Sequence, residues 1–169
     1  CSSYHLHHVA GKVMALAEFM EYGEAYATDI VSNARAFAGA LAAEGFDVLA
    51  ESRGYTASHQ VLTRHGELDS GAGAKAAQRL EEAGIITNMN MLPGDTKAMT
   101  PSGLRLGVQE LTRVGFSNDD MEEVASFYAR VLLHGEDPAA VRADVHALKQ
   151  QRQTIRYCFN EDERSGYPE

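Results

Sequence analysis

Apolar residues recur at every third or fourth position along residues 4–44, and this period predicts one long, nearly continuous helix. Side chains at this spacing share one side of a helix, so we expect the apolar stripe to be buried. Gly45 is suited to end the helix, because glycine readily adopts the left-handed backbone conformation that follows a helix. The stripe consists of Val9, Val13, Leu16, Ala17, Met20, Ile30, Ala34, Phe37, Ala38 and Leu41.

Short apolar runs bounded by turn residues predict strands in the middle of the chain. The expected strands are residues 46–50, 59–63, 85–87 and 104–108. Between the second and the third, apolar residues return to helical spacing, which predicts a helix that starts near Asp69 and ends at Gly84.

Two more helices are expected toward the C-terminus. Ser117, followed by Asp119 and Asp120, is typical of a helix start, because the serine accepts hydrogen bonds from first-turn N–H groups and acids suit the positive end of the dipole. Pro138 suits the first turn of a final helix. The end of the chain is polar, so we expect one domain over residues 1–155 and a loose polar tail over residues 156–169.

These elements together predict an α+β fold. We expect a small, largely antiparallel sheet of three or four strands, flanked by helices that cover one of its faces.

Composition and charge narrow the function. The chain has 169 residues, of which 44% are apolar and 23% charged, as in an ordinary soluble domain. Its net charge of −9 argues against nucleic acid or an anionic membrane as a partner. No stretch approaches the roughly 20 apolar residues of a membrane span.

Two cysteines, Cys1 and Cys158, are too few for a disulfide framework, so we expect a cytoplasmic location. The chain starts at Cys1 without a signal-peptide pattern, which suggests a fragment or a processed chain.

The stretch with most chemical interest is the run NMNMLPGD at residues 88–95, followed by PSGLRLG at residues 101–107. Pro93 and Gly94 predict a turn, because proline presets φ and glycine accepts positive φ. We therefore expect two short strands joined by a loop, with Arg105 near the start of the second strand.

Arg105 is the main candidate for ligand binding. Gly103 and Gly107 flank it, and glycines allow a ligand to approach the backbone closely. The guanidinium group matches a carboxylate or a phosphate with two parallel hydrogen bonds. The residues alone leave two interpretations, because Arg105 can equally pair with an acid of its own chain.

Histidines give a weaker signal. His5, His7 and His8 form a cluster, but no acid or cysteine lies nearby at zinc-site spacing, so a metal site is the less favoured interpretation. His59, at the head of a predicted strand, is either a structural histidine bonded to the backbone or a functional one. His65, with His134 and His146, is expected at the surface.

The combined motif resembles the C-terminal small domain of the serine hydroxymethyltransferase family, pyridoxal-phosphate enzymes of the aspartate-aminotransferase fold type. Residues 84–116 carry the resemblance through N-x-N-x-x-P-x-D, S-G-L-R-L-G, Thr112-Arg113 and Gly115-Phe116, with weaker similarity from His7 to about Leu133. The Gln-Glu-x-Thr-Arg form of residues 109–113 is similar to archaeal-type members and to aldolase relatives acting on other β-hydroxy amino acids. The resemblance implies a three- or four-stranded sheet flanked by helices.

The resemblance also implies roles for single residues. Arg105 would bind the α-carboxylate of the amino-acid substrate and so fix its orientation. Asn90 would contact the pterin ring of the folate co-substrate, since an amide both donates and accepts; the alternative is a turn-stabilising asparagine. His59 would support the substrate cleft. Ser2 and Ser3 stand where the family has glycines that help bind the cofactor phosphate, and their hydroxyl and amide groups suit that contact.

Two departures from the family pattern weaken the case for pterin binding more than the case for the carboxylate contact of Arg105. Pro101 stands where threonine is common, and residues 108–110 (Val-Gln-Glu) replace Thr-Pro-Ala.

The resemblance implies that this chain is not catalytic alone. In the family, the lysine that binds pyridoxal phosphate lies upstream in a large domain, within a Thr-Thr-His-Lys sequence. None of the chain's lysines stands in that context; they are Lys12, Lys75, Lys97 and Lys149. The expected partners are therefore an upstream large domain, a small amino acid, and a second subunit in a homodimer.

The implied reaction converts serine and a tetrahydropterin to glycine and methylene-tetrahydropterin, with pyridoxal phosphate as cofactor and tetrahydrofolate or a related pterin as co-substrate. One alternative keeps the cofactor in a threonine-type aldolase or transaldolase. Another is a non-catalytic domain that serves assembly or regulation.

Overall fold

The computed structural model describes residues 5–160, and within them the expected α+β class is confirmed. The elements, in chain order, are α1 (Leu6–Ala43), β1 (Asp47–Val48), the 3-10 turn η1 (Glu51–Arg53), β2 (Gln60–Arg64), α2 (Ala72–Glu82), β3 (Asn88–Asn90), β4 (Gly103–Gly107), α3 (Gln109–Arg113), the 3-10 turn η2 (Asn118–Asp120), α4 (Met121–Leu132) and α5 (Pro138–Gln151).

The four strands form one antiparallel sheet in the order β1-β2-β4-β3. Strand β4 is therefore bonded on both sides, to β2 and to β3. Its Leu104 and Leu106 are buried, as is Val61 opposite Leu106 on β2. These side chains join one hydrophobic core with residues of α1, α2 and α4, so the helices pack against this face of the sheet.

Helix α1 has the length that its apolar period predicts. It ends as expected at Gly45, whose φ is +101°, while the Phe46 N–H donates to the Leu41 carbonyl at 3.0 Å. The burial of its stripe, however, differs from the expectation. The C-terminal part, with Phe37 2% exposed, lies in the core, whereas Leu16 is 65% and Met20 90% exposed.

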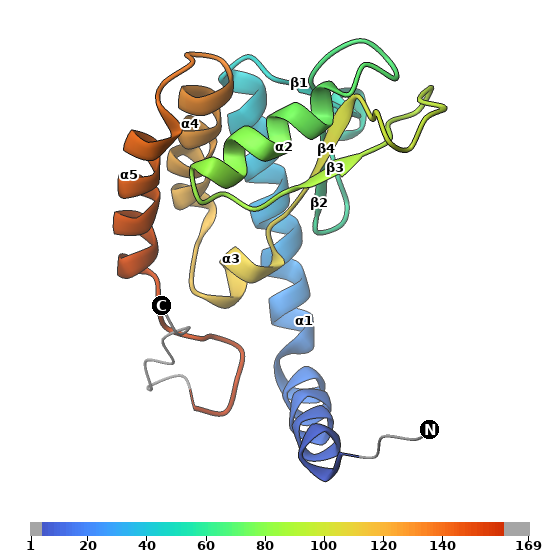
Figure 1. Ribbon diagram of the computed structural model, residues 1–169. Coiled ribbons are helices and arrows are strands. Elements are labelled where there is room, and N and C mark those ends of the chain that lie inside the picture. Colours follow the sequence, from blue (N-terminus) through green and yellow to red (C-terminus); the bar gives the residue numbers. More distant parts are fainter. Residues whose placement is uncertain (1–4, 161–169) are drawn as a thin grey trace.

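The N-terminal half of α1 begins away from the other elements (Figure 1). Although Glu18 in this half pairs with Arg113 of α3, the apolar side chains of Val13, Leu16 and Met20 are exposed within this chain. The expectation of one buried stripe is wrong for this half. The reason is that helical periodicity reports an apolar face but not whether the element that covers it belongs to the same chain.

Two local predictions were also inaccurate. The third strand lies at β3, not at residues 85–87, because the Ile85 N–H still donates to the Leu80 carbonyl at 2.9 Å and closes the end of α2, with Gly84 at φ +77°. The short helix α3 was not expected; it follows β4 after a single residue, Val108.

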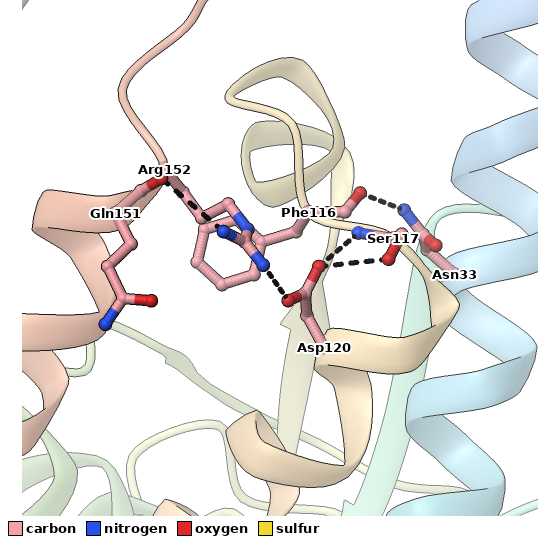
Figure 2. A network of polar contacts seen from close by, with 6 residues as sticks. All are labelled: Asn33, Phe116, Ser117, Asp120, Gln151 and Arg152. Atoms are coloured by element: carbon pink, nitrogen blue, oxygen red, sulfur yellow. Dashed lines mark hydrogen bonds and ion pairs between the residues drawn. The ribbon is translucent and has the colours of Figure 1, made fainter.

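A polar network confirms the predicted helix start at Ser117 and joins three parts of the fold (Figure 2). One oxygen of Asp120 accepts from the Ser117 N–H at 2.8 Å and from its hydroxyl at 3.0 Å. The other accepts from Arg152, after the end of α5, at 2.5 Å. From α1, Asn33 donates to the Phe116 carbonyl at 3.0 Å. Together these contacts hold α1, the start of α4 and the end of α5.

The segment after α5 also packs on the fold. The Arg156 N–H donates to the Arg113 carbonyl at 2.8 Å, and the Tyr157 hydroxyl donates to Asp29 of α1 at 2.6 Å. Burial, with this carboxylate contact, raises the pKa of Tyr157 to about 12. The expected polar tail thus begins with residues that contact α1 and α3, and its residues 161–169 lie outside the described part.

Helix α2 approaches β4 closely at a pair of glycines. A Cβ placed on Gly73 would lie 2.2 Å from the carbonyl oxygen of Gly103, and one placed on Gly103 would lie 2.4 Å from Cγ of Leu92. Each close contact is therefore possible only because glycine has no side chain at that position.

We predict that Gly73→Ala lowers the free energy of unfolding by about 1–3 kcal/mol, because the added methyl group meets backbone atoms. Gly39→Ala, in α1, is the matched control. No heavy atom lies within 4 Å of its added Cβ, and alanine favours helix, so it should stabilise the chain by about 0.5–1 kcal/mol. Urea unfolding of both variants measures this, and equal midpoints would contradict the contact.

Candidate functional site

Arg105 lies in the middle of β4, on the face of the sheet opposite the core. The neighbouring Leu104 is fully buried and Leu106 is 2% exposed, whereas Arg105 is half-buried. Because side chains alternate along a strand, Arg105 must extend from the other face. Across the sheet it is paired with Leu62 of β2 and Asn88 of β3. We call this side of the sheet the Arg105 face.

The arginine has no partner within the described part of the chain. Residues 5–160 contain five half-buried arginines, and four of them form ion pairs with carboxylates. The pairs are Arg64–Asp47, Arg113–Glu18, Arg130–Glu136, Arg130–Asp144 and Arg152–Asp120. Arg105 is the fifth, and no residue between 5 and 160 bonds its guanidinium group. A partly desolvated cation without an internal counter-charge is suited to bind an external anion.

Asn90 shares the Arg105 face. It pairs with Gly103, two residues before Arg105 on the same strand, and such diagonal neighbours lie roughly 7–8 Å apart. Its side-chain amide donates to the Met91 carbonyl at 2.6 Å, which leaves its carbonyl oxygen available to accept. This contact to the local backbone is of the kind expected for a turn-stabilising asparagine. It still leaves the carbonyl half of the Asn90 amide for a ligand.

Other expected site residues lie elsewhere. His59 is exposed and stands one residue before β2, near Val108, whose N–H donates to its carbonyl at 3.3 Å. Since Arg105 pairs with Leu62, about three residues or roughly 10 Å along the strand separate it from His59. Ser2 and Ser3 lie outside the described residues.

The N-terminal histidines do form a cluster, with ring centroids of His7 and His8 4.3 Å apart. Within the described residues, however, no group of three histidine, cysteine or acidic side chains is placed to hold a metal ion. His65 is half-buried, not a surface residue as expected. Burial lowers its pKa to about 4, and its ring nitrogen lies 2.8 Å from the Thr63 hydroxyl.

The lysines do not fit the attachment of pyridoxal phosphate. Lys12, Lys75, Lys97 and Lys149 are all exposed, on three helices and one loop. Attachment of this cofactor needs a lysine inside a closed site, where desolvation makes the amine reactive. Within the described residues, none of these lysines lies in a closed site formed by this chain.

Two residues near the site, Asn88 and Asp95, belong to the NMNMLPGD run but received no role from the sequence alone. Asn88 faces Arg105 directly, and its alternation with Asn90 would have placed both on one face had β3 been assigned correctly. Asp95 accepts hydrogen bonds from both ends of the β3–β4 loop, at Leu92 and Ser102. Its signal was its place after the Pro93–Gly94 turn, where a carboxylate commonly binds backbone N–H groups.

Comparison with known proteins gives consistent results. The family model described as Serine hydroxymethyltransferase matches residues 2–128. The chain is 55% identical over 161 residues to a serine hydroxymethyltransferase of Thermococcus kodakarensis, covering 94% of this chain and 37% of the relative. It is 50% identical over 160 residues to one of Methanopyrus kandleri, again covering 94% and 37%.

A solved structure is similar as well. The L-threonine transaldolase from Pseudomonas fluorescens superposes with a TM-score of 0.77 at 33% identity, covering 86% of this chain and 33% of that protein. The chain thus spans between a third and two fifths of the length of the proteins it matches. Within the described residues, no helix combines the length and apolarity needed to cross a membrane.

Proposed function

The chain belongs to the serine hydroxymethyltransferase family, and from this premise we propose that it works as the small-domain portion of a longer, pyridoxal-phosphate-dependent enzyme. In the proposed reaction, the enzyme transfers the hydroxymethyl group of serine to a tetrahydropterin and leaves glycine. The matched relatives are longer than this chain, which supports the proposal that residues outside this chain also contribute to the active site.

The observation that carries this proposal is the guanidinium group of Arg105 on the Arg105 face, with which no residue between 5 and 160 pairs. A planar guanidinium can donate two parallel hydrogen bonds to the α-carboxylate of serine or glycine. This two-point contact fixes the rotation of the amino acid as well as its position. Orientation of this kind contributes to rate because the reacting bond is already aligned when the reaction begins.

Asn90 supports the pterin half of the proposal. It lies on the same face as Arg105, so one ligand site can include both. The free carbonyl oxygen of its amide can accept from a ring N–H of a pterin. We assign His59 no direct contact with the amino acid; its proposed role is a supporting one near the start of β2.

Pyridoxal phosphate, when bound, supplies the electron sink for reactions at the α-carbon. The exposed lysines of this chain support attachment of the cofactor elsewhere, in an upstream large domain. The proposed task of this chain is to bind and orient the amino acid against that domain.

The exposed half of α1 supports such a partner domain. Leu6, Val13, Leu16, Phe19 and Met20 are each more than half exposed. Apolar side chains at helical spacing are ordinarily buried against another element, and contiguous exposed ones mark an interface. We propose that the rest of the polypeptide covers them. The family resemblance adds a homodimer and a cytoplasmic location to the proposal.

A second candidate is a transaldolase or aldolase that acts on threonine-like substrates. Its support is the structural similarity to the L-threonine transaldolase. A non-catalytic assembly domain is the third candidate. Arg105 argues against it, because its guanidinium group has no partner among residues 5–160.

We predict that the complete protein releases glycine from serine only when tetrahydrofolate or a related tetrahydropterin is present. The measurement is glycine formation with and without the pterin. Glycine formation from threonine that is the same with and without a pterin would instead support the aldolase. No glycine from either substrate, in protein loaded with pyridoxal phosphate, would contradict both enzymatic proposals.

Arg105→Ala should weaken the binding of glycine about a hundredfold, because a charge-assisted double contact contributes on the order of 3 kcal/mol. The absorbance of bound pyridoxal phosphate should not change. Arg79→Ala, on the exposed side of α2, is the matched control and should bind glycine normally. A spectral titration with glycine measures the affinities, and an Arg105→Ala affinity within twofold of wild type would refute the assignment.

Leu16→Glu tests the partner domain. In the isolated 169-residue chain this side chain is 65% exposed, so the melting temperature should stay within the small range typical of surface substitutions. In the complete protein a buried charge without a partner should cost about 3 kcal/mol or more. Thermal melting measures the effect of Leu16→Glu in the isolated chain and in the complete protein. An equal change in melting temperature in both would mean that this part of α1 is not covered in the complete protein.

A further inference from the structure

The loop between β3 and β4, residues 91–102, joins the two proposed ligand contacts. Asn90 immediately precedes this loop, and Arg105 follows it by three residues. Connections between neighbouring antiparallel strands usually have about two to five residues, so this loop is unusually long. The pairing of Asn90 with Gly103 closes the loop, but β3 has only three residues, so contacts within the loop add to what holds this end of the ladder in place.

One carboxylate oxygen restrains both ends of the loop. Oδ2 of Asp95 accepts from the Leu92 N–H at 2.8 Å and from the Ser102 N–H at 3.0 Å. The Ser102 hydroxyl donates to the same oxygen at 2.8 Å. Leu92 is two residues from Asn90, and Ser102 is three residues from Arg105. Asp95 therefore joins the two ends of the loop next to these residues.

A second aspartate fixes the loop to the rest of the fold. The Asp69 N–H donates to Oδ1 of Asp95 at 2.7 Å. In return, the Asp69 carboxylate accepts from the N–H groups of Thr96 and Lys97, each at 2.8 Å, and from the Thr96 hydroxyl at 2.6 Å. Asp69 has a φ of +56°, a left-handed conformation that aspartate tolerates better than most residues. The two loops thus hold one another.

The same restraint sets the packing over β4. Leu92 is 3% exposed, and its side chain occupies the space that a Cβ on Gly103 would need. Gly103 is paired with Asn90. The hydrogen bond from the Leu92 N–H to Asp95 therefore holds a side chain directly over the pair that sits beside Arg105.

The charge of Asp95 suits this role. Desolvation of the carboxyl opposes ionisation, but the hydrogen bonds from Leu92, Ser102 and Asp69 outweigh it and hold its pKa well below the usual range. Asp95 is therefore ionised at neutral pH, and hydrogen bonds to an ionised acceptor are the stronger kind.

We infer that Asp95 is a positioning residue: it sets the spacing of Asn90 and Arg105 through the β3–β4 loop, without touching either ligand. The inference rests on the proposed function, because those two residues matter together only if they bind one amino acid and one pterin. Displacements of about 1 Å at a binding site can cost up to about a hundredfold in rate.

The test compares Asp95→Asn with Asp120→Asn in the complete protein loaded with pyridoxal phosphate. Both aspartates accept hydrogen bonds from a serine N–H and a serine hydroxyl, but Asp120 accepts them from Ser117 at the start of η2 and not in the β3–β4 loop. Both variants should lower the melting temperature. Only Asp95→Asn should raise the KM for serine and the Kd for glycine, each by about tenfold or more.

Amide hydrogen exchange supplies a readout that needs no activity. Asp95→Asn should speed exchange at the N–H groups of Leu92 and Ser102, while Asp120→Asn should leave both unchanged. Ser102→Ala removes one donor to Asp95 and keeps the rest, so it should raise the same KM about fivefold, as expected for the loss of one such bond. This variant decides the question if Asp95→Asn does not fold.

Three results would overturn the inference: equal KM values for the Asp95 and Asp120 variants, unchanged exchange at Leu92 and Ser102 in Asp95→Asn, or a normal KM in Ser102→Ala. If wild-type protein binds no glycine, the proposed function fails by itself. The exchange experiment then still decides whether Asp95 sets the shape of the loop.

Discussion

The two-sided pairing of β4 is the constraint on which the rest of the structure depends. Because β2 and β3 flank this strand, alternate residues of β4 must face either the helices or the opposite side. Leu104 and Leu106 take the first position and are buried in the core. Arg105, between them, can then extend only from the opposite face. The close approach of α2 at Gly73 and Gly103 keeps the strand in this place.

Within residues 5–160, several carboxylates and most of the half-buried arginines are satisfied by contacts within the chain. Asp95 and Asp69 bind backbone N–H groups and hold two loops together. Asp120 likewise accepts from the Ser117 N–H, and Arg152, after the end of α5, donates to its other oxygen (Figure 2). Within residues 5–160, Arg105 alone among the half-buried arginines lacks such a partner. A fold that satisfies its other buried charges so fully makes this exception informative, since leaving a desolvated charge unpaired costs stability.

Much of this could be predicted from the sequence, because local signals and the motif agree for those parts. The length of α1, the helix start at Ser117 that leads through η2 into α4, and the strand that carries Arg105 follow from periodicity and turn residues. Burial along α1 could not be predicted, since Leu16 and Phe37 have the same pattern but different surroundings. The position of β3 was missed because Ile85 looks like a strand residue yet completes the end of α2. The contacts of Asp95 join residues that are up to 26 positions apart, and no local pattern reports them.

The most direct test of the central claim is an experimental structure of the complete protein with pyridoxal phosphate and glycine bound. We predict that both carboxylate oxygens of glycine lie about 2.7–2.9 Å from nitrogens of Arg105, as in a bidentate pair. A structure in which Arg105 pairs with an acid of the protein itself while glycine binds elsewhere would contradict this prediction.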